Sequence, residues 1–239
     1  MGKWKKWLSA GLFTAMLGTA IIAGPTADVS ANAGNKPYNI ENVSPDAHLA
    51  PSVGDSSSKT SSKAWHKIDG VCYNGSGKKV EGAITRGMDV SEWQGKINWK
   101  EAKKDLDFAF VRISYGTRHL DDYYDYNMTE AEAADVPVGT YVYSLAKTNK
   151  EALAEAQLAI RQMQGHKVSY PVAFDLEDEA TLGTLTRKEI SQIALTFCDE
   201  IRKAGYTPIL YMNLNWYNNF VDWNVLEGSG LDVWIASYG

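Results

Sequence analysis

Two acidic residues, Asp175 and Glu177, stand two positions apart at the end of the apolar run 170–174. Side chains on a strand alternate between its faces, so both carboxylates are expected on one face, with Cα atoms roughly 6.6 Å apart. Such a pair can divide acid and base roles. The charge of Asp175 is expected to raise the pKa of Glu177, as a general acid working near neutral pH requires. Acids that only cap the following turn are the alternative reading of this pattern.

Two further acids, Asp178 and Glu179, follow directly. If the strand continued, its period of two would also bring Glu179 to the same face. We favour Asp175 and Glu177 because they come straight after the apolar run. Asp178 and Glu179 are expected to begin a solvated loop.

The acids belong to a region in which strand-like and helix-like segments alternate. Nearly continuous apolar runs, typical of buried parallel strands, predict strands at 87–90, 108–114, 138–144, 171–175, 207–212 and 232–236. Helix starts are predicted where a capping residue stands three positions before a glutamate, namely at Asn98, Thr148 and Thr186. Because no glycine-rich phosphate loop occurs, the alternation predicts an α/β fold of the TIM-like, irregular β/α barrel type.

In a β/α barrel, reacting groups collect at the carboxyl ends of the strands. Taken singly, each aromatic residue there is more often core than site. Taken together, acids and aromatic rings on one rim favour a groove for a neutral polymeric sugar. The residues at the predicted strand ends are Asp89, Trp93, Tyr115, Tyr141, Tyr143, Asp175, Glu177, Tyr211, Asn213, Trp234 and Tyr238.

The first 33 residues have the pattern of a secretory signal peptide. Three lysines precede an apolar run at 8–23, and Ala31-Asn32-Ala33 forms a small-x-small cleavage site. An uncleaved membrane anchor is the alternative, but the run is short and broken by small residues. Residues 34–64 are rich in Ser, Asn, Pro and Gly and are expected to be a disordered linker. Turn signals within 65–85 suggest an N-terminal arm or hairpin.

Composition excludes several classes of partner. The formal net charge of -5 and the lack of a basic stripe argue against nucleic acid. Neither Cys72 nor Cys198 has the spacing of a metal ligand, and the histidines do not cluster, so no metal and no cofactor are expected. Export permits a disulfide between the cysteines. However, Cys198 falls on an apolar helical stripe with Phe197 and Ile201, which favours a small buried thiol.

Several segments resemble one known family. Gly87-Met88-Asp89-Val90-Ser91-Glu92-Trp93-Gln94-Gly95, followed by Ile97-Asn98-Trp99, closely resembles the opening signature of the family 25 glycoside hydrolases, the Chalaropsis-type lysozymes. Later segments resemble further strands of that family, in the order 108–116, 138–143, 171–177 and 233–238. The resemblance covers residues 86–239.

The resemblance implies hydrolysis of the β-1,4 bond between N-acetylmuramic acid and N-acetylglucosamine in peptidoglycan. Glu177 matches the family's general acid. Asp175 matches the neighbouring carboxylate, which stabilises an oxocarbenium-like centre or orients the substrate's acetamido group. Asp89 matches a first-strand acid that lines the site. The resemblance implies retention of configuration and leaves open whether a carboxylate or the substrate's own N-acetyl group is the nucleophile.

The chain departs from the family pattern at its end. Family members continue to a final strand and a further aspartate, whereas this sequence ends at Gly239. We therefore expect a barrel that lacks its last strand, with unpaired backbone groups on the strands beside the gap. The expected protein is a secreted or cell-wall-associated monomer that acts on peptidoglycan, with no membrane association after signal cleavage. A catalytically silent peptidoglycan-binding module and a non-functional truncated product are the alternatives.

Overall fold

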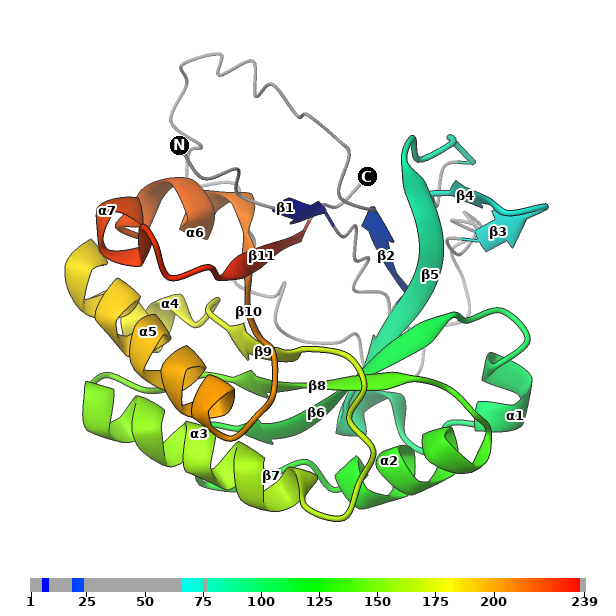
Figure 1. The fold of residues 1–239 in the computed structure, drawn as a ribbon, viewed down its shortest axis with the longest axis horizontal. Helices are drawn as coiled ribbons and strands as arrows, with labels where there is room; N and C mark the ends of the chain where they lie inside the picture. The colour runs from blue at the N-terminus through cyan, green and yellow to red at the C-terminus, as the bar shows by residue number, and fades with distance from the viewer. Residues whose placement is uncertain (1–5, 9–18, 24–65, 75–76, 237–239) are drawn as a thin grey trace, which may run out of the picture.

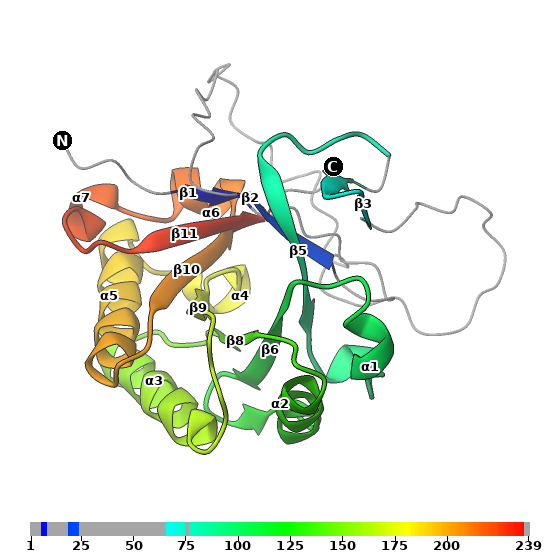
Figure 2. The same ribbon diagram turned by 45° about the vertical axis from the view of Figure 1, so that its right-hand side comes forward.

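The computed structural model describes residues 6–8, 19–23, 66–74 and 77–236. The described residues contain a curled sheet whose strands from β5 to β11 follow one another in chain order, apart from the short β7, which pairs with β6 (Figures 1 and 2). Its central strands all pair in parallel: β5 (Ala83–Val90), β6 (Phe108–Tyr115), β8 (Val138–Tyr143), β9 (Val172–Asp175), β10 (Pro208–Asn213) and β11 (Asp232–Ala236). Each predicted strand is present, and the irregular β/α barrel is confirmed.

Helices cover the outer side of this sheet (Figure 2). The helices of the described residues are α1 (Trp99–Ala102), α2 (Tyr124–Ala133), α3 (Asn149–Met163), α4 (Glu179–Leu182), α5 (Arg187–Lys203), α6 (Leu214–Asn219) and α7 (Trp223–Leu226), of which α4 lies within the curl of the sheet. The predicted starts of α1, α3 and α5 are confirmed, since Asn98, Thr148 and Thr186 each accept a hydrogen bond from the backbone N–H three residues later.

Helix α2 was not predicted, and its packing explains why. Its buried positions include Met128 and Ala131 but also the polar Asn127, which interrupts the apolar stripe that marks a helix. Asn127 is tied down because its Oδ1 atom accepts a hydrogen bond from Trp99 Nε1 over 3.1 Å. No side-chain hydrogen bond caps the start of α2 at Tyr123.

The strands separate two apolar clusters. The larger lies between the sheet and the helices and includes Val111, Val142 and Phe174. The smaller lies inside the barrel and contains Phe108, Phe110, Ala173, Ile209, Tyr211, Trp234 and Ala236. Neighbouring residues of one strand therefore belong to opposite clusters, as the alternation of side chains along a strand requires.

Two glycines make room for the rings inside the barrel. A Cβ atom at Gly87 would collide with the ring of Phe108, and one at Gly139 would meet the ring of Phe110 and the carbonyl oxygen of Pro171. The two phenylalanine rings meet edge to face at 6.0 Å, and Tyr170 stacks on Phe108 at 4.9 Å. The interior below the carboxyl ends of the strands is therefore filled.

The edges of the parallel sheet are paired with the beginning of the chain. β1 (Lys6–Leu8) pairs in parallel with β11, and β2 (Thr19–Ala23) pairs antiparallel with β5. The strands beside the expected gap thus have backbone partners from the segment predicted to be a signal peptide. The rest of that segment and the predicted linker at 34–64 lie outside the described residues.

The segment predicted to be an N-terminal arm contains a two-stranded sheet. β3 (His66–Ile68) pairs antiparallel with β4 (Val71–Tyr73). Asp69 and Gly70 join them with φ angles of 48° and 79°, the positive values that a tight hairpin turn needs. Asn74 makes the next turn, in which it accepts hydrogen bonds from the backbone of Gly77 and Lys78.

Candidate active site

Strand β9 delivers alternate side chains to the two sides of the sheet. Val172 and Phe174 pack in the outer cluster, whereas Ala173 packs inside the barrel. Asp175 therefore also points inside, and Glu177, two residues further, lies close enough for its charge to act on Asp175. The two side chains sit at the carboxyl end of the strand and are 6% and 9% exposed, respectively.

Asp89 joins this pair from strand β5. Its neighbours Met88 and Val90 pack in the outer cluster, so Asp89 faces the interior. The negative charge of Asp89 raises the pKa of both Asp175 and Glu177. The structure thus brings Asp89 to a pair of acids that begins 86 residues further along the chain (175 − 89).

All three acids hold protons more tightly than exposed carboxyl groups do. Burial raises the pKa of Asp89 to about 6. Burial also raises the pKa of Glu177 to about 7, with a further rise from Asp89 and an opposing effect of hydrogen bonds from Asn213. The pKa of Asp175 lies well above its usual range, first because of burial and then because of the charges of Glu177 and Asp89, against which Arg112 acts. The close carboxyls therefore retain a proton near neutral pH.

The predicted rise in the pKa of Glu177 is confirmed, and the charges of Asp175 and Glu177 do act on each other, but burial is the larger cause. Burial is the largest contribution, and Asp89 is the charge that adds to it. Asp175 is a near neighbour of Glu177 along the chain, so its effect can be expected from the sequence. Asp89 comes close to Glu177 only through the pairing of distant strands.

Arg112 is a member of the site that the sequence analysis missed. It lies on β6 with its side chain only 7% exposed, and its Nε atom donates to Asp121 Oδ2 over 2.9 Å. Its Nη2 atom forms an ion pair at 2.8 Å with Glu92, without hydrogen-bond geometry. The available signal was a single arginine within the apolar run 108–113. A buried cation needs anionic partners, and the buried Asp121 and half-buried Glu92 both follow strand ends.

These partners hold the short helix η3 (Glu92–Gln94) in place. Asp121 accepts a hydrogen bond from the backbone N–H of Glu92 over 2.8 Å, and the Glu92 carboxylate also contacts His119 Nε2 at 2.8 Å. His119 belongs to β7 (His119–Leu120), which pairs with the end of β6. The helix thereby presents Trp93, whose side chain is 65% exposed, on a fixed support.

Two predicted tyrosines form a stacked pair beside Asp175. The rings of Tyr115 and Tyr143 lie 4.8 Å apart at an angle of 16°. Tyr143 pairs in register with Tyr115 on one side and with Asp175 on the other. Burial, followed by the charge of Asp175, raises the pKa of Tyr143 above its usual range, so it stays a neutral hydrogen-bond donor.

Asp178 corrects one expectation. It was expected to begin a solvated loop, but it is buried, and its Oδ1 atom accepts a hydrogen bond from the backbone N–H of Thr181 at the start of α4 over 2.8 Å. Its Oδ2 atom accepts a hydrogen bond from the Tyr115 hydroxyl over 3.1 Å. Glu179 is exposed. Helix α4 begins at Glu179, so neither acid begins a loop, and the capping role of Asp178 accounts for its burial.

The other predicted contact residues divide by depth. Tyr211 and Trp234 are buried inside the barrel, where their rings meet at 4.7 Å, and Trp234 also meets Phe110 at 4.7 Å. Tyr211 pairs in register with Asp175, and Trp234 pairs in register with Tyr211, so the two rings lie on the strands next to Asp175. Tyr141 is half-buried on β8, facing Asp89, whose charge raises its pKa after the larger effect of burial.

Asn213 has two functions at the end of β10. Its Oδ1 atom accepts a hydrogen bond from the backbone N–H of Trp216 over 3.0 Å and so caps α6, while hydrogen bonding to Glu177 lowers the pKa of that acid. Tyr238 lies outside the described residues.

Several buried polar atoms face the interior without an internal partner. Within the described part of the chain, Asp175 Oδ1, Glu177 Oε1 and Trp234 Nε1 have no hydrogen-bond partner. Buried polar atoms are nearly always bonded in folded proteins, so these positions suit a bound polar molecule or water.

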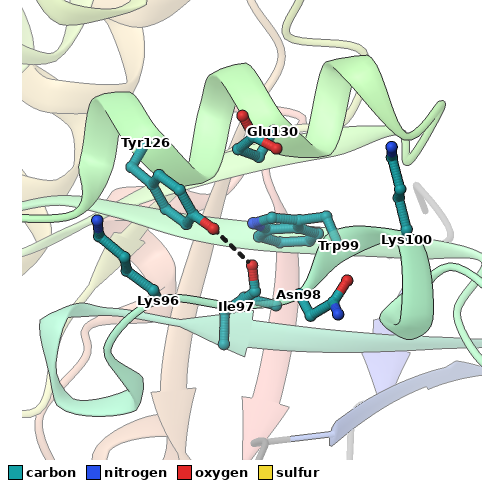
Figure 3. A pocket seen from close by; sticks show the side chains of 7 residues that line it. All are labelled: Lys96, Ile97, Asn98, Trp99, Lys100, Tyr126 and Glu130. Atoms are coloured by element: carbon teal, nitrogen blue, oxygen red, sulfur yellow. Dashed lines mark hydrogen bonds between the residues drawn. The ribbon is translucent and has the colours of Figure 1, made fainter.

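Two surface hollows lie away from the acids. One, of about 370 Å³, is bounded by α1 and α2 and lined by residues that include Lys96, Trp99, Tyr126 and Glu130 (Figure 3). There the Tyr126 hydroxyl donates to the Ile97 carbonyl over 3.0 Å. The other, of about 210 Å³, lies beside Lys67 and Asp107. None of the three acids lines either hollow, so neither hollow serves them.

Three further observations concern cofactors, cysteines and membranes. Over the described residues, no group of three or more His, Cys, Asp or Glu side chains is arranged to hold a metal ion. Cys72 and Cys198 are buried free thiols. No helix in the described ranges is long and apolar enough to cross a membrane.

Curated relatives match the chain at about one quarter identity. Lysozyme M1 of Streptomyces globisporus is 26% identical over 164 residues, which cover 64% of this chain and 55% of that protein. The uncharacterised protein YegX of Escherichia coli strain K12 is 26% identical over 166 residues, 64% of this chain and 56% of that protein. The chain thus spans about half the length of these relatives.

Solved structures show the same fold. A family 25 glycosyl hydrolase from Bacillus anthracis superposes with a TM-score of 0.54 at 24% identity, covering 63% of this chain and 69% of that one. GHIP, a family 25 glycosyl hydrolase of Streptococcus pneumoniae, superposes with a TM-score of 0.55 at 24% identity, covering 64% and 68%. The family model described as glycosyl hydrolases family 25 matches residues 88–239, which include all three acids and most of the barrel. The chain therefore belongs to glycosyl hydrolase family 25.

Proposed function

We propose that this protein hydrolyses the β-1,4 bond between N-acetylmuramic acid and N-acetylglucosamine in peptidoglycan. The observation that carries the proposal is the meeting of Asp89, Asp175 and Glu177 inside the barrel at the carboxyl ends of β5 and β9, where each has a raised pKa. Membership of family 25 and the likeness to Lysozyme M1 support the same reaction class.

In the proposed reaction, Glu177 donates its proton to the glycosidic oxygen as the bond from that oxygen to the anomeric carbon breaks. A pKa of about 7 suits this group, because it is protonated in a useful fraction and is still a strong enough acid. Glu177 then recovers a proton from the water that completes hydrolysis, as a retaining scheme requires.

Asp175 is assigned the stabilising role beside the reacting carbon. A negative or partly negative carboxylate there favours the positive charge that develops in an oxocarbenium-like transition state. Its proton equilibrium is shared with Glu177, so donation of the Glu177 proton and ionisation of Asp175 are linked. Asp89 adds negative charge from β5 and keeps both pKa values high.

The aromatic residues are proposed to bind the glycan. Tyr115 and Tyr143 offer a stacked pair at the rim, and Tyr115 is 37% exposed. Trp93 offers an exposed ring on η3, and Tyr141 faces Asp89. Asn213 is proposed to take part in substrate binding by holding, through hydrogen bonding, the carboxyl group of Glu177 that contacts the substrate. Tyr211 and Trp234 are proposed to contact the sugar through the unpartnered Trp234 Nε1 atom and through their two rings, which meet beside Asp175.

We further propose that the protein is exported, acts as a monomer, and works outside the cell or in the cell wall. The basic start, the apolar run at 8–23 and the cleavage pattern Ala31-Asn32-Ala33 support export. Peptidoglycan, the proposed substrate, lies outside the membrane. Nucleic acid, a metal and a cofactor have no part in the proposed reaction.

The test uses purified peptidoglycan incubated with the full chain and with Glu177→Gln. New reducing N-acetylmuramic acid ends, identified by mass spectrometry, are expected with the parent protein and absent with the variant. Glu179→Gln is the matched control, because Glu179 is an exposed acid only two residues further along the chain, at the start of α4. Equal release by Glu177→Gln would remove Glu177 from the mechanism. A folded protein that binds peptidoglycan without cleaving it would instead indicate a binding module.

A further inference from the structure

Among the described residues, the reaction proposed above leaves several buried carboxyl groups unused, and Glu155 is the least exposed of them. Glu155 lies on α3, on the outer side of the sheet, and is only 2% exposed. Its Oε2 atom accepts a hydrogen bond from Ser144 Oγ over 2.8 Å, and its Oε1 atom accepts one from the backbone N–H of Leu145 over 3.0 Å. Both donors belong to the turn that follows β8. A carboxylate buried this deeply is stable only if such bonds offset its lost hydration.

The turn held by Glu155 connects three strand ends. The backbone N–H of Ser144 donates to the Asp175 carbonyl over 3.0 Å, and the Tyr143 carbonyl accepts from the Gly116 N–H over 2.8 Å. The Leu145 side chain also packs against Gly116, where an added Cβ would lie 3.2 Å from Leu145 Cδ1. A shift of this turn would therefore be felt at the ends of β6 and β9 together.

We propose that Glu155 is a positioning residue that sets the stacked ring pair Tyr115–Tyr143 beside Asp175, and through it the binding of a substrate sugar ring. Tyr143 is the residue immediately before the anchored turn, so the backbone that Glu155 fixes determines where its ring stands. The position of the Tyr115 ring depends in turn on that of Tyr143, because the two rings stack with their centroids 4.8 Å apart. This proposal rests on the function proposed above only for the identity of the ligand.

Burial raises the pKa of Glu155 to about 7, against the effect of the bonds from Leu145 and Ser144. A group with this environment is costly to keep ionised at neutral pH. Its two acceptor atoms match the two donors that the turn presents to it. The matching explains why an acid, rather than an apolar residue, occupies this position in the outer core.

The test compares Glu155→Gln with Glu151→Gln in the full chain. Glu151 lies one turn earlier on the same helix and accepts hydrogen bonds from Lys147 N and Thr148 Oγ1 at the exposed start of α3, so the chemical change is identical. The amide introduced by Glu155→Gln can accept only one of the two bonds, because its NH₂ group cannot accept from the second donor. Ser144→Ala, which removes one donor and keeps the Leu145 bond, is the milder second variant.

The first readout needs no substrate. Tyrosine ring signals are recorded by NMR with ring-labelled tyrosine and assigned with Tyr115→Phe and Tyr143→Phe. In the parent protein and in Glu151→Gln, contacts between the two rings are expected. In Glu155→Gln they are expected to weaken or vanish while the protein remains folded, and in Ser144→Ala they are expected to weaken less. An unchanged ring pair in folded Glu155→Gln would overturn the proposal and leave Glu155 a purely structural residue.

The second readout separates positioning from loss of folded protein. With soluble glycan fragments, Glu155→Gln is expected to raise KM by about tenfold and to change kcat less. The reason is that the variant loses one charge-assisted hydrogen bond that holds the ring pair in its binding position. Loss of folded enzyme would lower kcat alone. If the parent protein hydrolyses no glycan but the ring pair is lost in Glu155→Gln, the proposed function fails and the positioning role stands. If the parent protein is active and Glu155→Gln leaves KM unchanged, the positioning role fails.

Discussion

The hydroxyl group of Tyr115 donates a hydrogen bond to the carboxylate of Asp178 over 3.1 Å. This bond links the end of β6 to the turn that begins directly after Glu177. Since Asp178 also caps α4, one side chain fixes both the turn that carries the proposed acid and the outer ring of the stacked tyrosine pair.

Tyr115→Phe keeps the ring and removes this bond. The stack with Tyr143 is expected to persist, while Asp178 loses a buried partner. We expect KM for glycan fragments to rise roughly three- to tenfold, the usual range for one lost hydrogen bond. Steady-state kinetics measure the effect. Tyr126→Phe is the control, because its hydroxyl bonds to Ile97 at the outer hollow of Figure 3 and is expected to leave KM unchanged. Equal effects of the two changes would argue against a role for the Tyr115–Asp178 bond.

Asp89→Asn tests the electrostatic coupling of the acids. The charge of Asp89 raises the pKa of Glu177, so its removal lowers that pKa. The activity of the parent protein is expected to fall as the pH rises through about 7, where Glu177 loses its proton. In Asp89→Asn this alkaline limb is expected to move to lower pH. The pH dependence of kcat/KM measures the shift. A limb that stays in place would show that Asp89 does not act on the titrating acid.

Asp175→Asn is expected to make the protein more stable at neutral pH while impairing its activity. The pKa of Asp175 is raised in the folded state, so the folded protein binds more protons than the unfolded chain, and stability falls as the pH rises above about 4, the pKa of an unfolded aspartate. An amide removes this cost. Thermal unfolding is expected to show a higher Tm for Asp175→Asn at pH 7, and a smaller difference near pH 4.

The control for this comparison is Asp125→Asn, since the Asp125 side chain is 86% exposed. It is expected to change Tm little at either pH. A lower Tm for Asp175→Asn at pH 7 would mean that the carboxylate of Asp175 stabilises the fold more than its burial destabilises it.

Arg112→Gln removes the buried cation between Asp121 and Glu92. Asp121 would lose its cation in a buried setting, and Glu92 would keep only its contact with His119, so we expect a loss of about 3–5 kcal/mol in the free energy of unfolding. Denaturant unfolding measures it. The matched control is Arg202→Gln, whose ion pair with Asp199 is 2.7 Å long but exposed, and whose expected cost is below about 1 kcal/mol. Similar losses in the two variants would contradict a dominant role of burial.

The sequence alone determined the main parallel strands, the starts of α1, α3 and α5, and the face on which the acids stand. The apolar runs that predicted β6, β8 and β9 are nearly continuous, and the caps at Thr148 and Thr186 use contacts within one turn. Because these signals depend on neighbours a few residues away, they can be read without knowing the fold. For the same reason, the period of two along β9 was enough to place Asp175 and Glu177 together.

The tertiary structure decided what depends on distant pairing. Helix α2 was missed because Asn127 owes its buried place to Trp99, and Arg112 was missed because its acidic partners follow other elements. The cause of the raised Glu177 pKa, the capping role of Asp178 and the anchoring of Ser144 by Glu155 likewise depend on how the assembled chain packs. Burial and charge–charge distance are properties of the assembled barrel, so no local pattern carries them.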